Sequence, residues 1–509
     1  MRFSVPSVPL WQDSFDMSSL LAFDLGASSG RAILGRLKDG RLSIEELRRF
    51  RNDPVSHNGE LHWNLPALWS EMQSSLESLA AHGVERLDSI GVDTWGVDYA
   101  LLGEHGALLE NPYHYRDART DGLMEEVTRR LSRERIYSVT GIQFMPINTL
   151  YQLYAAARRT PKLLAAARSL LTIPDLLNSW LTGKIVCEYT NASTTQFLDG
   201  KTRHWAADLL RDLDIPTHFL APIVAPGTVL GGLLPDLARR PALAMTAVVA
   251  PACHDTGSAV AAVRASGKTA FLSSGTWSLL GTEVRTPIAS PEALRLNFTN
   301  EGGVAGSVRL LKNITGLWLL EGCRRDWERQ GQALEWPALL AAAESAAPFR
   351  HLIDPDDQSF VRPEEMTAAI AAYCKRTDQP LPASPGAFVR AILESLALKY
   401  RLVLEELESL TGTHFDIIRV IGGGSQNEML NQFTADATAR TVLAGPAEAT
   451  ALGNLAMQMV GSGMIGSLDE ARDLIDRSFP ARSYTPRSTD RWDTAYSKLQ
   501  SYCGGVCRA

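Results

Sequence analysis

An adjacent histidine and aspartate, His254 and Asp255, are the side chains in this sequence best placed to do chemistry. They follow an apolar run at 247–250, which is typical of a buried strand, and precede a small-residue segment at 257–263 that can pack closely as a helix. Ligands of α/β proteins collect where strands end and helices begin. A carboxylate there can accept the proton of an attacking hydroxyl and aim its oxygen, so Asp255 is the candidate general base.

Each of these two residues also has a structural alternative. Asp255 stands before Thr-Gly and fits a helix N-cap, where aspartate is favoured, so the local sequence leaves both roles open. His254, taken alone, is more often a structural histidine than a substrate ligand.

Two other stretches share one design, in which a turn rich in glycine and hydroxyl residues joins two apolar strands. The first spans 20–35 with its turn at 26–30, and the second spans 269–282 with its turn at 273–276. Backbone N–H groups and hydroxyls of such turns can bind phosphate, and two of them can hold a triphosphate from two sides. Asp24, at the end of the first strand, is a candidate Mg²⁺ ligand through water. The alternative for each stretch is a plain hairpin, and no G-x-x-x-x-G-K-[ST] loop is present.

Two weaker signals complete the candidate site. A Gly-Gly-Gly-Ser-Gln-Asn turn at 422–427 follows a short β-rich run, and its glycines would let the backbone approach a phosphate or a flat ring; a flexible turn explains them equally. Asp93, Trp95 and Asp98 flank Gly96, and their apolar faces and hydroxyl acceptors suit a sugar. The alternative for this cluster is an edge strand with a buried tryptophan.

Bulk properties exclude several classes of protein. A chain of 509 residues is expected to form two or more domains, and its net charge of -7 argues against a general nucleic-acid binder. It has no apolar run of about 18 residues, which a membrane span needs. Residues 1–18 lack a basic start and an apolar core, so we expect an extension or an upstream start before Met17, not a secretory signal. None of the six cysteines forms a C-x₂-C pair, which predicts reduced thiols in a cytosolic protein.

Hydrophobic spacing predicts the main supporting elements. Apolar residues recur at helical intervals over 65–81 and over 387–410, which predicts two amphipathic helices. A strand is predicted at 304–311, and Asn313 is expected to begin a helix that runs toward Trp327.

Together the motifs resemble the FGGY family of carbohydrate kinases, and the resemblance covers the chain from about residue 20 to about residue 480. The motifs that carry it are Asp-Leu-Gly-Ala-Ser-Ser-Gly-Arg at 24–31, Gly-Val-Asp-Thr-Trp-Gly-Val-Asp-Tyr at 91–99, His-Asp-Thr at 254–256, Ser-Ser-Gly-Thr-Trp-Ser at 273–278 and Gly-Gly-Gly-Ser-Gln-Asn at 422–427. Many members carry Thr-Thr where Ser28-Ser29 stands here.

This resemblance implies an α/β actin-like ATPase fold, related to ribonuclease H, in which two similar domains flank a central cleft. The domains expected are an N-terminal extension at 1–18, a first domain at 19–265 with the sugar site and the base, a second at 266–480 with the nucleotide site, and a C-terminal tail at 481–509. The implied activity is ATP- and Mg²⁺-dependent phosphorylation of L-rhamnulose to L-rhamnulose 1-phosphate in L-rhamnose catabolism. A cytoplasmic monomer or homodimer with no nucleic-acid or membrane partner is expected.

The resemblance also assigns roles to residues, with Asp255 as the proton acceptor. The positions that match the sugar site are Gly96, His254, Asp255, Thr256 and Asn313. The positions that match the nucleotide site are Ala27, Ser28, Ser29, Gly30, Arg31, Thr276, Glu321, Gly422, Gly423 and Gly424. Glu321 departs from the pattern, because related proteins can carry glutamine there. A glutamate would meet phosphate oxygens badly, so its contact is expected to run through Mg²⁺ or water.

Two alternatives remain, and a third is excluded. The first is a kinase for another ketose, such as L-fuculose, D-xylulose or L-ribulose, since only sugar-pocket residues separate these enzymes. The second is a non-catalytic actin-like protein, either a sugar sensor or a filament subunit; the presence of both Asp24 and Asp255 argues against it. An NAD enzyme fails for lack of a G-x-G-x-x-G loop between strand and helix.

Overall fold

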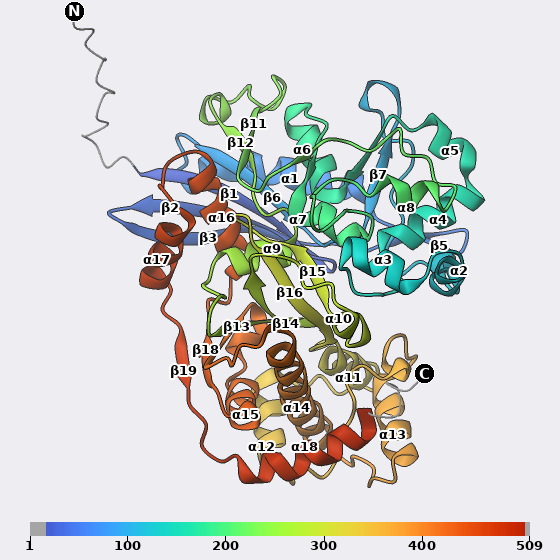
Figure 1. Ribbon diagram of the computed structural model, residues 1–509. Coiled ribbons are helices and arrows are strands. Elements are labelled where there is room, and N and C mark those ends of the chain that lie inside the picture. Colours follow the sequence, from blue (N-terminus) through green and yellow to red (C-terminus); the bar gives the residue numbers. More distant parts are fainter. Residues whose placement is uncertain (1–16, 504–509) are drawn as a thin grey trace, which may run out of the picture.

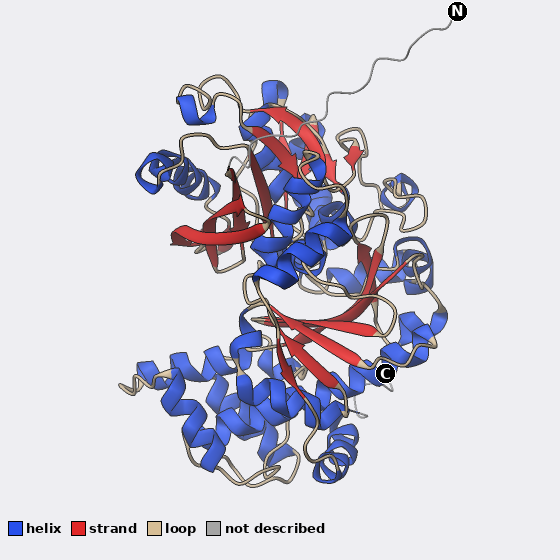
Figure 2. Cartoon of the chain, turned by 90° about the vertical axis from the view of Figure 1, so that its left-hand side faces the viewer, coloured by secondary structure: helices blue, strands red, loops and turns tan. Residues whose placement is uncertain are grey.

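The computed structural model describes residues 17–503, which form two lobes, each a mixed β-sheet covered by helices (Figure 1, Figure 2). Most of the expected N-terminal extension and the last six residues, with Cys507, lie outside the described residues. Within residues 17–503 the cysteines are free and buried, and no helix is both long and apolar enough to cross a membrane.

The sheet of the first lobe has six strands in the order β11-β12-β6-β1-β2-β3. These strands are β1 (Ser18–Leu25), β2 (Ser29–Lys38), β3 (Arg41–Arg51), β6 (Ser89–Thr94), β11 (Thr228–Gly232) and β12 (Ala247–Ala250). The first three form an antiparallel meander, β6 and β12 add in parallel to β1, and β11 closes the edge in the antiparallel sense.

The sheet of the second lobe repeats this topology in the order β15-β16-β14-β13-β17-β18-β19. Its strands are β13 (Thr269–Ser274), β14 (Trp277–Val284), β15 (Thr299–Gly302), β16 (Val308–Thr315), β17 (Ile417–Ile421), β18 (Thr441–Ala444) and β19 (Arg482–Tyr484). Strands β13, β14 and β16 form the meander, β17 and β18 add in parallel, β19 closes the edge, and β15 is an addition. The prediction of two similar halves is therefore confirmed.

Helices cover both sheets, and short strand pairs lie beside the first. The short pairs are β4 (Val55–His57) with β5 (Glu60–His62), β7 (Tyr99–Leu102) with β8 (Ser169–Thr172), and β9 (Cys187–Glu188) with β10 (Ile223–Val224). The helices of the first half are α1 (Leu65–Ser78), α2 (Leu123–Arg130), α3 (Arg133–Thr140), α4 (Thr149–Arg159), α5 (Pro161–Ala166), α6 (Ile173–Thr182), α7 (Tyr189–Ala192), α8 (Ala207–Arg211) and α9 (Asp255–Ala261). Those of the second half are α10 (Pro291–Arg295), α11 (Trp318–Arg329), α12 (Trp336–Ser345), α13 (Met366–Arg376), α14 (Pro385–Thr411), α15 (Glu428–Thr438), α16 (Ala449–Gly461), α17 (Leu468–Ser478) and α18 (Asp490–Cys503).

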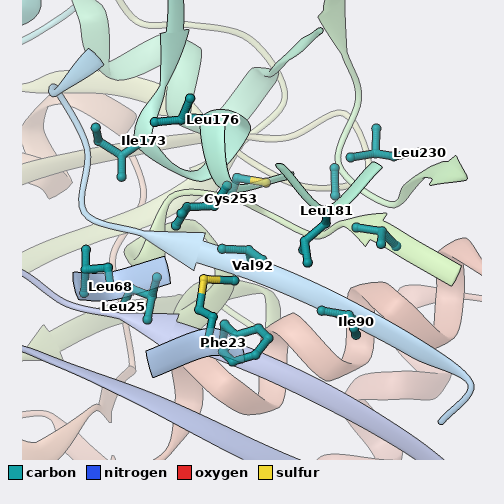
Figure 3. Packing of buried hydrophobic residues seen from close by; sticks show 14 of the residues in the cluster. Phe23, Leu25, Leu68, Ile90, Val92, Ile173, Leu176, Leu181, Leu230 and Cys253 are labelled. Atoms are coloured by element: carbon teal, nitrogen blue, oxygen red, sulfur yellow. The ribbon is translucent and has the colours of Figure 1, made fainter. Parts of the chain in front are cut away.

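Strand β1 is buried on both faces, which explains its unbroken apolar sequence. Because side chains alternate along a strand, Phe23 and Leu25 pack into the core of the first lobe, where Val92 of β6 joins them (Figure 3). The alternate residues Leu20 and Ala22 face the opposite way, into a second cluster shared with α9 and α16.

Helices α9 and α16 join the two lobes. Each directly follows a parallel strand of its own sheet, α9 after β12 and α16 after β18, and the two helices pack against each other. Their apolar cluster also includes Phe271 of the second sheet, so one core connects both lobes.

The residues expected as a C-terminal tail complete the second lobe. Strand β19 pairs with β18, and α18 buries Trp492 and Leu499 in a cluster with residues of α14 and α15. The tryptophan ring contacts Phe349 and Phe433 edge-on or tilted, with ring centroids 4.8 and 5.2 Å away.

Candidate active site

A cleft of about 900 Å³ lies between the lobes, and both lobes line it. Most residues that the sequence analysis singles out meet there. They are Asp24, Ala27, Ser28, Ser29, Arg31, Gly96, His254, Asp255, Thr256, Thr276, Asn313, Glu321, Gly422 and Gly423.

Gly30 and Gly424 are not among the lining residues, and packing explains why each is a glycine. A Cβ added at Gly30 would lie 2.2 Å from the ring of Phe50, and one added at Gly424 would lie 2.0 Å from Oγ of Ser274. Gly30 lets the turn after β1 pack against Phe50, and Gly424 lets the 422–427 turn pack against Ser274, whether or not their backbone also contacts a ligand.

Asp255 lies where the sequence predicts, between the end of β12 and the first turn of α9. His254 occupies the N-cap position, and Asp255 is the first residue of the helix. The alternative that Asp255 is the N-cap residue is therefore wrong. Oδ1 of Asp255 accepts hydrogen bonds from the backbone N of Thr256 at 2.6 Å and from its Oγ1 at 3.1 Å. The Asp255 side chain is 30% exposed, so the carboxylate is held from behind while it faces the cleft.

His254 is almost enclosed and contacts charged groups through both ring nitrogens. Nε2 lies 3.4 Å from Oδ1 of Asp255, and Nδ1 lies 3.0 Å from Arg309 and 3.3 Å from Glu301. Burial acts to raise the pKa of Glu301, but its contacts with His254 and Arg309 lower that pKa below the ordinary value. Glu301 and Arg309 carry no motif, and the sequence analysis misses both.

A buried carboxyl group, Glu188, fixes the loop before Asp255. It accepts hydrogen bonds from the backbone of Thr190 and Cys253 at 2.9 Å each, and Oγ1 of Thr190 in turn accepts from the backbone of His254 at 3.1 Å. Burial raises the pKa of Glu188 to about 7, while these hydrogen bonds act to lower it. Local sequence offered no sign of this long-range role.

The two glycine–hydroxyl turns occupy equivalent places in the two sheets. One joins β1 to β2, where Leu25 pairs with Gly30, and the other joins β13 to β14, where Ser274 pairs with Ser278. Residues of both turns line the cleft, so glycine and hydroxyl residues of the type that can hold a polyphosphate border it from two lobes.

An ion-pair bridge crosses the cleft at Arg31. Its guanidinium contacts Asp24 on β1 and Glu448, which precedes α16 in the other half of the chain. Burial raises the pKa of Asp24, and the charge of Arg31 opposes that shift. Glu448 is a residue that the sequence analysis misses.

Asp24, a carboxylate that lines the cleft, fits a Mg²⁺ ion held mainly by phosphate and water. Asp24 lines the cleft and lies beside Asp93 in the register of β1 and β6, and burial raises the pKa of Asp93 well above its ordinary value, with the charge of Asp24 adding to the shift. Among residues 17–503 no group of three or more His, Cys, Asp or Glu residues could hold a metal. Mg²⁺ in phosphoryl transfer needs only one or two carboxylates besides phosphates and water.

Gly96 and Asn313 also line the cleft. A Cβ added at Gly96 would lie 3.0 Å from Thr194 and 3.2 Å from Nε2 of His254, so the glycine leaves space beside the histidine. The side-chain amide of Asn313 donates to Oε1 of Gln143 at 2.9 Å, across the two halves of the chain. Gln143 is a further residue missed in the sequence.

The prediction that Asn313 begins a helix is wrong. It lies in β16, where it pairs with Leu279 of β14, and α11 begins only at Trp318. Pairing with β14 carries the strand on through Thr315, whereas β15 pairs only with residues 308–311.

The aromatic cluster near Gly96 supports the cleft wall. Trp95 lines the cleft, but Asp98 is turned inward and accepts from the indole nitrogens of Trp63 at 2.6 Å and Trp95 at 2.9 Å. Burial raises the pKa of Asp98 to about 6. The preceding strand β6 is central, between β1 and β12, so the edge-strand alternative is wrong although the buried-tryptophan part of it holds.

Family models match the two halves of the chain in succession. The N-terminal domain of the FGGY family of carbohydrate kinases matches residues 19–262, and its C-terminal domain matches residues 270–462. The chain belongs to the FGGY family of carbohydrate kinases.

Curated relatives are similar over nearly their whole lengths. A rhamnulokinase of Bacteroides thetaiotaomicron is 46% identical over 479 residues, which cover 94% of this chain and 98% of the relative. A rhamnulokinase of Oceanobacillus iheyensis is 43% identical over 464 residues, which cover 91% of this chain and 97% of the relative.

Solved structures show the same fold at lower identity. Gluconate kinase from Lactobacillus acidophilus aligns with a TM-score of 0.80 and 18% identity over 97% of this chain and 99% of that one. Ligand-bound xylulose kinase from the same organism aligns with a TM-score of 0.78 and 17% identity over 96% and 97% of the two chains. The predicted actin-like fold of two α/β domains is confirmed.

Proposed function

We propose that this carbohydrate kinase transfers the γ-phosphate of ATP to O1 of L-rhamnulose, giving L-rhamnulose 1-phosphate and ADP. The observation that carries the proposal is the position of Asp255, which faces a cleft lined by two equivalent phosphate-type turns. The identity of the sugar rests on relatives that are rhamnulokinases and 41–46% identical over more than nine-tenths of the chain.

In the proposed reaction, the open-chain ketose presents its O1 hydroxyl to Asp255. The carboxylate accepts the proton as O1 forms a bond to the γ-phosphorus, and the bond from that phosphorus to the β,γ-bridging oxygen breaks, so that ADP leaves. The proton then passes from Asp255 to solvent. Positioning and charge neutralisation account for most of the rate in reactions of this kind.

The nucleotide lies across both turns. Residues of the first turn (Ala27, Ser28, Ser29, Gly30) and Arg31 address the phosphates from one lobe, and Thr276 with the 422–424 turn addresses the nucleotide from the other. Mg²⁺ held by Asp24, through water, would neutralise charge on the phosphates. Glu321 lies on α11 at the cleft wall, 3.9 Å from Arg324, and meets the nucleotide through the metal or water.

The sugar lies against the first domain, 19–265, with Asp255, while the second domain, 266–480, holds most of the nucleotide. Gly96, His254, Thr256 and Asn313 surround the ketose; all four line the cleft. Closure of the lobes would exclude water and so limit wasteful hydrolysis of ATP.

ADP release by the purified protein tests the substrate, with Mg-ATP and L-rhamnulose, L-fuculose, L-ribulose, D-xylulose or glycerol. We expect kcat/KM for L-rhamnulose to exceed the others at least about tenfold, which is about 1.4 kcal/mol of transition-state binding. Preference for another ketose would replace L-rhamnulose but keep the kinase. Absence of any sugar-dependent turnover would favour the sensor or filament alternative.

The variant Asp255→Asn tests the base. Its kcat should fall by about three orders of magnitude, within the range of general-base effects, while ATP still binds. Asp236→Asn is the matched control, because Asp236 is 84% exposed and is not among the residues that line the cleft. A near-normal kcat for Asp255→Asn would show that another group accepts the proton.

A further inference from the structure

A buried ion pair, Glu301 with Arg309, lies behind the proposed base. The two residues face each other in the register of antiparallel strands β15 and β16, with Nη2 of Arg309 3.1 Å from Oε2 of Glu301. Their side chains are only 8% and 1% exposed. Burying two charges costs free energy unless further contacts offset the lost hydration. A third group that both residues contact therefore indicates what the buried pair does.

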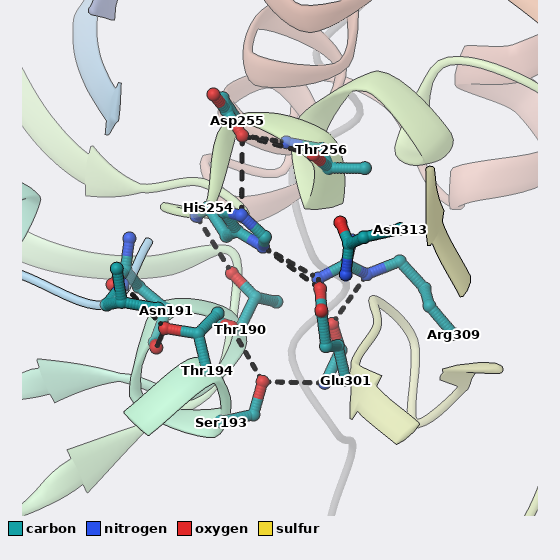
Figure 4. A network of polar contacts seen from close by, with 12 residues as sticks. Thr190, Asn191, Ser193, Thr194, His254, Asp255, Thr256, Glu301, Arg309 and Asn313 are labelled. Carbon is teal, nitrogen blue, oxygen red and sulfur yellow. Dashed lines mark hydrogen bonds and ion pairs between the residues drawn. The ribbon is translucent and has the colours of Figure 1, made fainter. Parts of the chain in front are cut away.

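That shared group is Nδ1 of His254, as Figure 4 shows. Arginine can only donate a hydrogen bond, so the 3.0 Å contact with Arg309 is a hydrogen bond when Nδ1 carries no proton and accepts. A neutral ring that accepts at Nδ1 carries its proton on Nε2, which lies 3.4 Å from Oδ1 of Asp255. Either neutral tautomer sets one ring lone pair near a carboxylate, because Nδ1 lies 3.3 Å from Oε2 of Glu301 and Nε2 lies 3.4 Å from Oδ1 of Asp255. The tautomer with its proton on Nε2 is the one that also accepts from Arg309.

With the proton on Nε2, three donors address the same oxygen of Asp255. Oδ1 then receives His254 in addition to the backbone N and Oγ1 of Thr256. Among the described residues, all the hydrogen bonds recorded for this carboxylate go to Oδ1. Oδ2 is therefore the oxygen left to accept a proton from a hydroxyl in the cleft.

The pair of Glu301 and Arg309 also connects the two lobes beside Asp255, the proposed general base. His254 and Asp255 belong to the first family domain, whereas Glu301 and Arg309 belong to the second. Nε of Arg309 donates to the carbonyl of Gly302 at 2.9 Å, and the N–H of Gly302 donates to Oγ of Ser193 in the first half at 2.7 Å. The geometry around His254 thus depends on how the lobes are placed.

We propose that Glu301 and Arg309 are positioning residues for the proton transfer. Arg309, fixed by Glu301, keeps the proton of His254 on Nε2, so that His254 holds Oδ1 of Asp255 and leaves Oδ2 for the acceptor hydroxyl. This inference rests on the proposed function, in which Asp255 is the base, and adds two residues from the other lobe to its machinery.

Nitrogen NMR of protein labelled at the histidine ring tests the inference without substrate. In the wild type, the His254 signals, assigned by their loss in His254→Gln, should show a neutral ring protonated at Nε2. Because Arg309→Met alone leaves a buried carboxylate unpaired, the double variant Glu301→Gln/Arg309→Met removes both charges together. In it the ring should no longer be held in that single tautomer.

Kinetics of the same proteins supply the second measurement. The double variant should lose about 100-fold in kcat, the scale on which a reacting group displaced by about 1 Å acts, with KM for ATP unchanged. Glu301→Gln alone keeps Arg309 but leaves its buried guanidinium without a carboxylate, so it should lose part of the kcat that the double variant loses. Glu394→Gln is the matched control, since Glu394 is 1% exposed, pairs with Arg390 in α14 and does not line the cleft.

The outcomes separate the inference from the proposed function. A wild-type ring protonated on Nδ1, or a double variant with normal kcat, would overturn the inference alone. A wild type without sugar-dependent turnover would overturn the proposed function and with it the catalytic part of the inference.

Discussion

The carbonyl oxygen of Ser258 and the α-carbon of Gly453 touch where α9 crosses α16, so closely that a Cβ on Gly453 would lie 1.7 Å from that oxygen. Helix α9 begins with Asp255, and α16 directly follows Glu448, the partner of Arg31. The crossing therefore sets the distance between the base in one half of the chain and the ion-pair bridge to the other.

Gly453→Ala should force the two helices apart. We expect it to lower the free energy of unfolding by about 2 kcal/mol, as overpacking of a tight core does, and to lower kcat by displacing Asp255. Urea unfolding and steady-state kinetics measure the two effects. Gly232→Ala is the control, because its Cβ would lie 3.9 Å from the nearest atom, the carbonyl oxygen of Thr246. Equal unfolding midpoints for the two variants would mean that the crossing adjusts without strain.

Gly96→Ala should impair sugar binding selectively. The added methyl group would fill the space beside Nε2 of His254 and Thr194, where we place the ketose. We expect kcat/KM for the sugar to fall at least about tenfold, or about 1.4 kcal/mol, while KM for ATP stays unchanged. Gly423→Ala is a matched comparison on the nucleotide side, since a Cβ there meets no atom within 4 Å. A rise in KM for ATP but not for the sugar in Gly96→Ala would place the sugar elsewhere.

The sequence predicted those parts of the site that depend on local chemistry. Glycine-rich turns and polar residues at strand ends, such as those at 26–30 and 254–255, can be recognised in a sequence. Tight backbone turns and ligand contacts need particular residue types. Glu448 and Gln143 were missed because their roles arise from partners 417 and 170 positions away, and nothing in their local sequence differs from a surface residue. The sequence marked Asp98 as part of a candidate sugar site but did not show which way its side chain points. Only the fold determines that the carboxyl group turns inward to two indoles.

Arg31→Gln should lower the efficiency with which the enzyme uses ATP. Without the guanidinium, Asp24 and Glu448 remain as unpaired carboxylates that repel a triphosphate. We expect kcat/KM for Mg-ATP to fall on the order of 100-fold, or roughly 2.7 kcal/mol of transition-state stabilisation. Arg31→Lys should lie between, because an ammonium keeps the charge but lacks the fork that spans two carboxylates.

Arg48→Gln serves as the control for Arg31→Gln. Arg48 also pairs with a glutamate, Glu71, but both side chains are substantially exposed and neither lines the cleft. Exposed pairs contribute little, so its kinetics should match the wild type. If Arg31→Gln behaved in the same way, the bridge would have no part in nucleotide use.

His114 should make the fold sensitive to acid. It is 5% exposed, stacks on the rings of Trp63 and Tyr115, and accepts a hydrogen bond at Nδ1 from the backbone of Arg116 at 3.0 Å. Burial, with the charge of Arg116, lowers the pKa of His114 from 6.5 to about 4. Between these values the unfolded chain binds more protons than the folded one, so stability falls as the pH falls.

The measurement is urea unfolding at pH 7 and at pH 5 for the wild type and for His114→Gln, which cannot titrate. The variant loses ring stacking, so its absolute stability should be lower, but the wild type should lose up to about 2 kcal/mol more between the two pH values, at about 1.36 kcal/mol per unit. His204→Gln, at an exposed position, should keep the wild-type dependence. Identical pH dependence in the wild type and His114→Gln would mean that the imidazole can be protonated without loss of its contacts, and that another group accounts for any acid lability of the fold.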